Sequence, residues 1–197
     1  MTLPRGLRVA WREVHDAASR REVSRGLLSE LLPGAVFVSR CARCGGDHGR
    51  IRASGTDAAV SVSYAGGWAA VAIAAAGTRV GVDIVAADAG GLDRVLPGAD
   101  ARAWARVEAV LKADGRGLDV DPARVRVVGD EDGTWSARVD GGPWWEGYDV
   151  AGPAGVVTAV AIAAASAHEL GAVVRAARSG GESARGGSPI PRESSAR

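Results

Sequence analysis

A single carboxylate interrupts an apolar run near the middle of the chain. Asp83 stands within Gly81–Val85, where the sequence Gly-Val-Asp-Ile-Val favours a buried β-strand. A buried charge costs free energy unless it is paired, hydrogen-bonded or bound to a metal. Taken alone, the pattern favours an acid at a strand end that bonds a neighbouring loop, and a metal ligand is the alternative.

A second group of residues has helical spacing. Trp104, Glu108 and Lys112 fall at positions i, i+4 and i+8, which lie above one another on one face of a helix. A Glu–Lys surface pair, stabilising a helix by a few tenths of a kcal/mol, accounts for this spacing. It does not account for the Gly-x-Gly-Leu that follows, or for the use of the only lysine in the chain. Lysine acts as a compact charge or shifts its pKa for proton transfer, whereas arginine stays charged.

Hydrophobic periodicity and turn residues predict the elements that must position these groups. Helices are expected over residues 16–32 and 100–112, and Gly66-Gly67 favours a hairpin between two β-rich runs. The repeated order of strand, helix and further strands predicts an α+β fold in two halves of similar layout. Strands are expected over residues 7–14, 35–39, 58–64, 67–75, 79–85, 125–129, 135–139 and 156–164.

The composition narrows the class of protein. A formal net charge of +1 gives no support for nucleic-acid binding by bulk electrostatics. Residues 1–11 lack the charged start and apolar core of a signal peptide, and the longest apolar run, 156–167, is too short to span a bilayer. A cytoplasmic protein without membrane contact is therefore expected. Residues 178–197 are rich in Ser, Gly, Arg, Pro and Glu, which predicts a disordered tail.

The two motifs together resemble a known signature. Gly-Val-Asp-Ile, followed by Trp-x-x-x-Glu-x-x-x-Lys-x-x-Gly-x-Gly-Leu, resembles the signature pair of the Sfp-type 4′-phosphopantetheinyl transferases. Ser63–Trp68 resembles the Ser-His-Ser-Gly segment that precedes the Asp motif in that family. His48-Gly49-Arg50 resembles the Gly-Lys/Arg-Pro element that meets the phosphate of the coenzyme.

Two more segments fall in the order of this family. Arg20 and Arg21 resemble the basic residues that open its first long helix, and Gly147-Tyr148 with residues 156–163 resembles its closing strands. The similarity spans residues 7–165. Any one of these elements is a weak signal, whereas several in one order are specific.

The implied fold is a pseudo-dimer of two similar α+β halves with coenzyme A in the cleft between them. Residues 1–78 form the first half, and residues 79–170 form the second half, which carries the metal site. A monomer is the expected assembly.

The implied activity is transfer of 4′-phosphopantetheine from coenzyme A to a serine of an acyl, polyketide or peptidyl carrier protein. Asp83, Glu108 and Lys112 are the implied catalytic residues, and Asp83 and Glu108 are the implied metal ligands. Two carboxylates and pyrophosphate oxygens suit Mg²⁺, which neutralises the pyrophosphate and stabilises charge on the departing 3′,5′-ADP. Lys112 neutralises developing phosphate charge or helps proton movement. Either Glu108 or a metal-bound water could deprotonate the serine, and the sequence leaves both bases open.

Coenzyme binding is assigned by the same resemblance to Arg20, Arg21, Arg50, Ser63 and Tyr64. Forked, permanently charged guanidinium groups suit phosphate recognition. For each arginine taken alone, a solvated surface role is the more common outcome, and for Ser63 the alternative is a strand hydroxyl facing a neighbour.

Three positions depart from the pattern of the family. Val85 replaces a second acid that often follows the Asp, Tyr64 replaces the usual His, and Val107 replaces a Lys that commonly precedes the helix acid. One metal ligand is lost, and water could replace it. These departures motivate an alternative, a catalytically silent relative that binds coenzyme A or a carrier protein without transfer.

Cys41, Cys44 and His48 invite a zinc interpretation. A structural zinc site usually has four ligands, and only three soft candidates stand here. Asp47, His15 or His168 could supply a fourth, but nothing in the sequence brings one close. A structural or incidental thiol pair is therefore the favoured interpretation, and a small zinc-binding interaction protein is the alternative.

Overall fold

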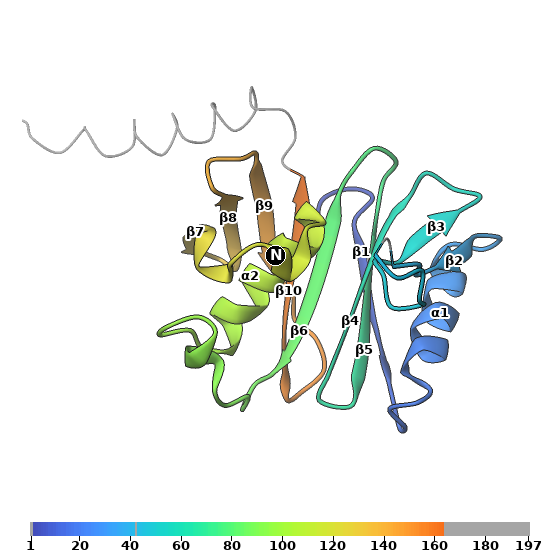
Figure 1. Ribbon diagram of the computed structural model, residues 1–197, viewed down its shortest axis with the longest axis horizontal. Coiled ribbons are helices and arrows are strands. Elements are labelled where there is room, and N and C mark those ends of the chain that lie inside the picture. Colours follow the sequence, from blue (N-terminus) through green and yellow to red (C-terminus); the bar gives the residue numbers. More distant parts are fainter. Residues whose placement is uncertain (1, 42, 164–197) are drawn as a thin grey trace, which may run out of the picture. The chain divides into compact units, whose positions relative to one another are not determined.

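A computed structural model of the protein describes residues 2–41 and 43–163. The predicted tail, residues 178–197, and His168 lie outside the described residues. Figure 1 shows the helices and strands along the described chain. The helices are α1 (Arg20–Leu31) and α2 (Ala101–Asp114), with short 3₁₀ turns η1 (Leu92–Arg94), η2 (Gly117–Asp119) and η3 (Pro122–Arg124). The strands are β1 (Arg8–Glu13), β2 (Val36–Val38), β3 (Arg52–Ser54), β4 (Ala59–Ala65), β5 (Trp68–Ala74), β6 (Val80–Ala86), β7 (Val125–Glu131), β8 (Thr134–Val139), β9 (Trp144–Asp149) and β10 (Val156–Ala163).

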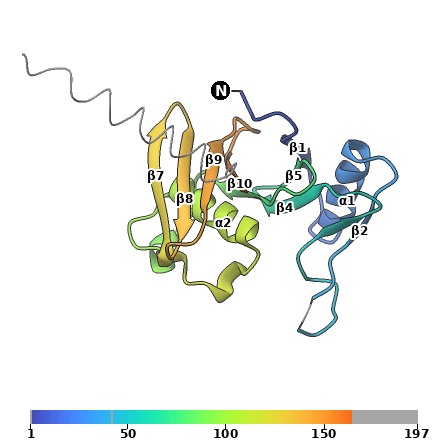
Figure 2. The same cartoon turned by 90° about the horizontal axis from the view of Figure 1, so that it is seen from above.

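The strands form two main antiparallel sheets. We call β1-β5-β4 the α1 sheet and β6-β10-β9-β8-β7 the α2 sheet, while β2 pairs with β3 alone. In Figures 1 and 2, α1 lies beside its sheet and α2 lies against one face of its own. The α+β prediction is confirmed at this level, and both expected helices exist. No helix in the described part of the chain combines the length and hydropathy needed to cross a bilayer.

The expected hairpin is present, but two strands escaped the pattern analysis. β4 and β5 pair antiparallel, with Ala65 opposite Trp68 across the Gly66-Gly67 turn. β3 is only three residues long, and β9 contains Gly147, which weakens the strand signal. A side chain at Gly147 would overlap the ring of Trp135, its partner across the ladder. The glycine is therefore a packing requirement of the α2 sheet.

The helix α1 begins later than the sequence pattern predicts. A turn precedes it, in which Ser19 N and Ser19 Oγ both donate to the carbonyl oxygen of Asp16. The helix then packs on the α1 sheet through Leu27 and Leu28, in a cluster that includes Val71 and Ile73 of β5. The charged residues of α1 are exposed or partly exposed.

The two sheets meet where β4 lies beside β6. The backbone N–H of Val82 on β6 donates to Ser61 Oγ on β4 at 3.0 Å. At this edge of β6 a side-chain hydroxyl thus accepts the hydrogen bond that a neighbouring strand would otherwise accept. Elsewhere along this junction, Trp11 Nε1 on β1 donates to Thr158 Oγ1 on β10 at 3.2 Å. These bonds join the α1 sheet to the α2 sheet, whose strand β6 carries Asp83.

Candidate active site

Asp83 lies inside β6 and is almost fully buried, with 5% of its surface exposed. Its Oδ1 atom accepts hydrogen bonds from Ser63 Oγ at 2.6 Å and from Lys112 Nζ at 2.5 Å. Lys112 Nζ also donates to Ser63 Oγ at 2.9 Å, which closes a three-membered network. The strand-end interpretation is wrong, because Asp83 pairs with Ala159 in the middle of the ladder. The cost of burying this carboxylate is offset by a cation and a hydroxyl.

A close helix–strand contact sets this network. Gly81 shares a strand face with Asp83, since side chains at i and i+2 point the same way. A Cβ atom at Gly81 would overlap the carbonyl oxygen of Ala109 and lie 2.5 Å from the backbone nitrogen of Ala113. The backbone of α2 therefore rests directly on β6. This contact brings Lys112, in the last turn of α2, within reach of Asp83.

Glu108 stands one turn before Lys112 on the same helix face and is partly buried. Among the described residues its carboxylate makes no hydrogen bond or ion pair, because the Lys112 ammonium is bonded to Asp83 and Ser63 instead. Burial, and next the nearby Asp83 carboxylate, raise the pKa of Glu108, while Lys112 opposes them. The two acids are therefore close enough to repel each other. The simple Glu–Lys surface pair does not describe this helix face.

The donor set fits a hard divalent cation. Within the described chain, the hydrogen bonds of Asp83 fall on Oδ1, which leaves Oδ2 and the Glu108 carboxylate as available oxygen ligands. Mg²⁺ is commonly held by one or two carboxylates and keeps several waters. Val85, on the same strand face as Asp83, is 7% exposed and packs in the core beneath α2. It contributes no oxygen, so any further ligands must come from solvent or substrate.

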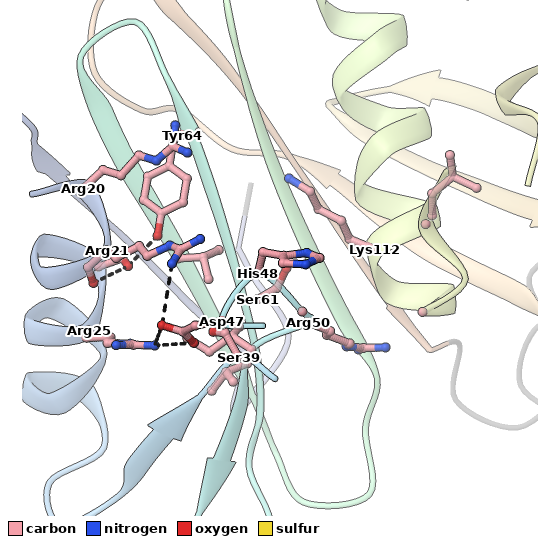
Figure 3. Close-up of a pocket in the computed structure, with 18 residues that line it drawn as sticks. Arg20, Arg21, Arg25, Ser39, Asp47, His48, Arg50, Ser61, Tyr64 and Lys112 are labelled. Atoms are coloured by element: carbon pink, nitrogen blue, oxygen red, sulfur yellow. Dashed lines mark hydrogen bonds and ion pairs between the residues drawn. The ribbon is translucent and has the colours of Figure 1, made fainter. Parts of the chain in front are cut away.

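A cationic cleft with a volume of about 360 Å³ adjoins the acids. Figure 3 shows the arginines of α1 on one side of this cleft and Lys112 of α2 on the other. Of the residues the structure describes, Asp83, Ser63 and Glu108 are not part of the lining of the cleft. The lining does include Lys112, which donates a hydrogen bond to Asp83. Lys112 thus connects the cleft with the buried acid. The basic residues of the lining are Arg20, Arg21, Arg25, His48, Arg50 and Lys112.

Two arginines of α1 are held by an acid from the loop between β2 and β3. Arg25 Nη2 donates to Asp47 Oδ1 at 3.2 Å, and Arg21 Nη1 lies 3.6 Å from Asp47 Oδ2, as the dashed lines in Figure 3 show. All three side chains are exposed or nearly so. Exposed ion pairs contribute little to stability, so an anion in the cleft can compete for these guanidinium groups.

Tyr64 is tied to α1. Its hydroxyl lies 2.7 Å from Ser24 Oγ, and Ser24 Oγ donates its hydrogen to the carbonyl oxygen of Arg21, so Tyr64 is the donor. The Arg20 guanidinium carbon lies 5.4 Å from the centre of the Tyr64 ring, a cation–π distance. Tyr64 therefore positions Arg20 as well as lining the cleft.

Arg50, like Arg20, has no counter-ion in contact among the residues that the structure describes. No hydrogen bond or ion pair joins it to another residue in the described part of the chain. Loss of water around its guanidinium, and then repulsion by Arg79 and Arg52, lower the pKa of Arg50, while Asp114 opposes them. A Cβ atom at Gly115, the left-handed residue that ends α2, would lie 2.5 Å from Arg50 Nη1. The glycine after the helix motif thus makes room for this cation.

The structure therefore divides the residues predicted from sequence into two groups. Arg20, Arg21, Arg50 and Tyr64 line the cleft beside Lys112, and Ser63 is instead buried against Asp83. Val107, 3% exposed, packs in the core beside the α2 sheet.

Sequence reasoning missed five polar residues of the lining, Ser24, Arg25, Ser39, Asp47 and Ser61, as cleft residues. The helical spacing of Arg25 from Arg21 was a signal that could have found one of them.

Comparison with known proteins adds no family assignment. No protein-family model matches the chain, and no curated protein matches it in sequence.

Proposed function

We propose that the protein is a 4′-phosphopantetheinyl transferase of the Sfp type. It would move 4′-phosphopantetheine from coenzyme A to a serine of an acyl, polyketide or peptidyl carrier protein. One observation carries the proposal: the buried Asp83, bonded by Lys112 and close to Glu108, adjoins a cleft whose lining is rich in arginine. A pyrophosphate ester needs both features, cations to bind it and acids to hold a metal.

The pseudo-dimer is part of this proposal. Residues 1–78 would form one half, with α1 and its sheet, and residues 79–170 the other half, with α2 and its sheet. The repeated order of strand, helix and strands supports this division, as does the position of β4 beside β6. The acids and the cleft would then belong to the seam between the halves.

The side chains of the cleft suit a substrate with several phosphates. Arg50 has no counter-ion in contact in the part of the chain that the structure describes, and Arg21 and Arg25 share the exposed Asp47. Guanidinium groups bind phosphate oxygens in a forked geometry, so these three residues would hold the 3′,5′-ADP part of coenzyme A. Lys112 would shift from Asp83 toward the pyrophosphate as negative charge develops there.

The reaction transfers one group and balances as a displacement. The oxygen of the carrier serine bonds to the phosphorus that bears pantetheine, and the bond from that phosphorus to 3′,5′-ADP breaks. The serine proton must leave to a base, for which Glu108 and a water molecule are the two candidates. Asp83 and Glu108 would hold Mg²⁺, which supplies charge neutralisation at the pyrophosphate when bound.

Intact mass spectrometry of carrier proteins tests the proposal. The protein is incubated with coenzyme A, Mg²⁺ and several apo carriers, and one carrier should gain the mass of a single phosphopantetheine arm. A carrier whose acceptor serine is replaced by alanine should gain nothing. If no carrier is modified under conditions in which a known transferase modifies them all, the proposal is wrong.

A second function, binding without transfer, has its own supporting observations. Lys112 already occupies Asp83 Oδ1, and Val85 stands where a further acid would complete a metal site. Calorimetry would then detect coenzyme A binding in a protein that modifies no carrier. Val85→Glu should restore transfer if the missing ligand is the cause, since the new carboxylate would share a strand face with Asp83.

A further inference from the structure

A cluster of soft metal ligands lies in the loop between β2 and β3, separate from Asp83 and Glu108. Cys41, Cys44 and His48 each offer a ligand atom, and these atoms all lie within 4.8 Å of one another. Cys44 Sγ and His48 Nε2 are 2.9 Å apart. Both cysteines are free thiols. Three side chains from a short stretch of chain therefore converge on one point.

The backbone of this loop is folded around the two sulfur atoms. The amide of Gly46 donates to Cys44 Sγ at 3.4 Å. The amides of Cys44 and Arg43 hydrogen-bond to Cys41 and lower the pKa of its thiol. Cys41 N also donates to the Gly46 carbonyl at 2.7 Å. Amides directed at the Cys41 sulfur favour its thiolate, the form in which cysteine binds a metal.

Glycine at position 46 makes the convergence possible. A Cβ atom on Gly46 would lie 3.1 Å from His48 Cδ2 and 3.3 Å from Cys44 Sγ, which is crowded on both sides. Gly45, with φ of 71°, adopts the left-handed conformation that the turn between them requires. The backbone thus reserves space for the imidazole beside the thiol.

We propose that Cys41, Cys44 and His48 bind one Zn²⁺ ion, with water as the fourth ligand. Two thiolates and an imidazole are the donor set that zinc prefers, and three protein ligands with one open position are a known zinc arrangement. Of the other candidates for a fourth ligand, Asp47 is engaged by Arg21 and Arg25, His15 lies near Glu13, and His168 lies outside the described residues.

The site would stabilise a loop that has few other anchors. The loop spans residues 39–51 and joins two strands of three residues each. Nearly all of its described residues are exposed or partly exposed, and Ile51 is its buried contact with the core. His48, Gly49 and Arg50 of this loop line the cationic cleft. A zinc ion would hold that part of the cleft in place, whichever reaction the cleft serves.

Cobalt and zinc binding to the reduced full-length chain test the proposal. Protein stripped with a chelator and kept under reductant is titrated with Co²⁺, which should give thiolate-to-cobalt charge-transfer bands that Zn²⁺ abolishes. After desalting, the protein should retain about one zinc per chain, and both thiols should resist a thiol reagent. Thiols that react at the same rate with and without zinc, or retention below about 0.1 zinc per chain, would overturn the proposal.

Matched variants locate the ion. His48→Gln should lose the zinc, whereas His15→Gln, at an exposed histidine outside the cluster, should keep it. Cys44→Ser should lower the charge-transfer intensity by about half, because one of two thiolates is gone. Glu108→Ala should keep the zinc, and zinc lost from this variant but kept by His48→Gln would place the ion at the acids and contradict the assignment.

Limited trypsin digestion gives a measure that does not depend on spectroscopy or activity. Arg43 stands between the two cysteines and is exposed, so the Arg43–Cys44 bond is open to cleavage. With zinc tenfold above its dissociation constant, the metal-free population and hence this cleavage should fall about tenfold. Cleavage after Arg94, an exposed residue of η1, is the control and should be unchanged. Equal rates at Arg43 with and without zinc would contradict a zinc-stabilised loop.

Discussion

The two helices are attached to their sheets in different ways. α1 buries Ser24, Leu27 and Leu28 among its 12 residues, whereas α2 buries eight of its 14 residues, mostly alanine and valine. Small side chains and Gly81 let the backbone of α2 rest on β6, and this contact fixes where Lys112 meets Asp83. α1 leaves Arg21 and Arg25 on its surface, and within the described residues their ion pairs are with the loop residue Asp47 alone.

Under the proposed function, this difference separates two tasks within one site. Acids that must hold a metal belong on the element with the most buried packing, because their spacing cannot vary. Cations that bind phosphate tolerate looser attachment, because long side chains reach a ligand from several positions. The α2 side of the site is therefore fixed, and the α1 side can adjust.

The largest effect is expected on the fixed side, from Glu108→Ala. Loss of one acid should lower the rate of carrier modification by on the order of 10²-fold, as for other electrostatic catalytic groups. Intact mass measured over time gives the rate. Glu146→Ala, which removes an acid of β9 hydrogen-bonded to Tyr148, is the control and should leave the rate unchanged. Equal losses in both variants would mean that Glu108 acts through stability alone.

Gly81→Ala tests whether the close contact of α2 with β6 supports the fixed side. The new methyl group would overlap the backbone of α2, so the helix must shift, at a cost of about 3 kcal/mol. Thermal unfolding followed by circular dichroism should show a midpoint lower by about 6–12 °C. Gly90→Ala is the matched control, because no atom lies within 4 Å of a Cβ there. An unchanged midpoint for Gly81→Ala would remove the distinction between the two helices.

On the adjustable side, Arg50→Ala should weaken coenzyme A binding without unfolding the protein. Loss of one charge-assisted contact to phosphate should raise the dissociation constant about tenfold in calorimetry. Arg138→Ala provides the comparison, since Arg138 lies over the Trp144 ring and outside the cleft. If the two variants bind equally well, the cleft is not the coenzyme site.

The smallest effect concerns stability and pH. The pKa of Glu108 is raised in the folded protein, so its ionisation destabilises the native state. This penalty is absent below the ordinary pKa of 4.5 and complete above the raised pKa. Glu108→Gln, neutral throughout, should therefore raise the unfolding midpoint near pH 7, and the gain should vanish toward about pH 4.

The matched variant on α1 should behave in the opposite sense. Hydrogen bonding from Arg12 lowers the pKa of Glu30, an exposed residue, so its ionisation is favoured by folding. Glu30→Gln should leave the midpoint unchanged or lower it slightly near neutral pH. A gain in stability from Glu30→Gln equal to that from Glu108→Gln would argue against burial as the cause.

Elements with strong local signals could be predicted from the sequence. The Gly66-Gly67 hairpin and the helix ending at Gly115 follow from turn and cap residues, which act over a few positions. The start of α1 could not be predicted, because the turn at Asp16 competes with the helix for the same backbone groups. The residue pattern missed β9, which only the family resemblance at Gly147-Tyr148 indicated, because Gly147 is explained by the Trp135 ring from another strand.

The sequence could predict the relative positions of site residues that lie on one helix or strand, because their spacing along the chain sets which face they share. Glu108 and Lys112 share a helix face as expected, but the partner of Lys112 is Asp83, which only the packing of α2 on β6 reveals. Ser63 could equally have faced a ligand, and its burial beside Asp83 depends on how β4 meets β6. The pairing of Asp47 with α1 could not be predicted from the sequence, because no periodic pattern places an irregular loop against a helix.

That pairing has a consequence for thermodynamic linkage. An anion that competes with Asp47 for Arg21 and Arg25 draws them from an acid that belongs to the same loop as Cys41, Cys44 and His48. Anion affinity and loop conformation are therefore coupled, and such coupling is reciprocal by necessity. A change that favours attachment of the loop to α1 lowers the affinity for the anion. Binding of the anion lowers the equilibrium constant for loop attachment by the same factor.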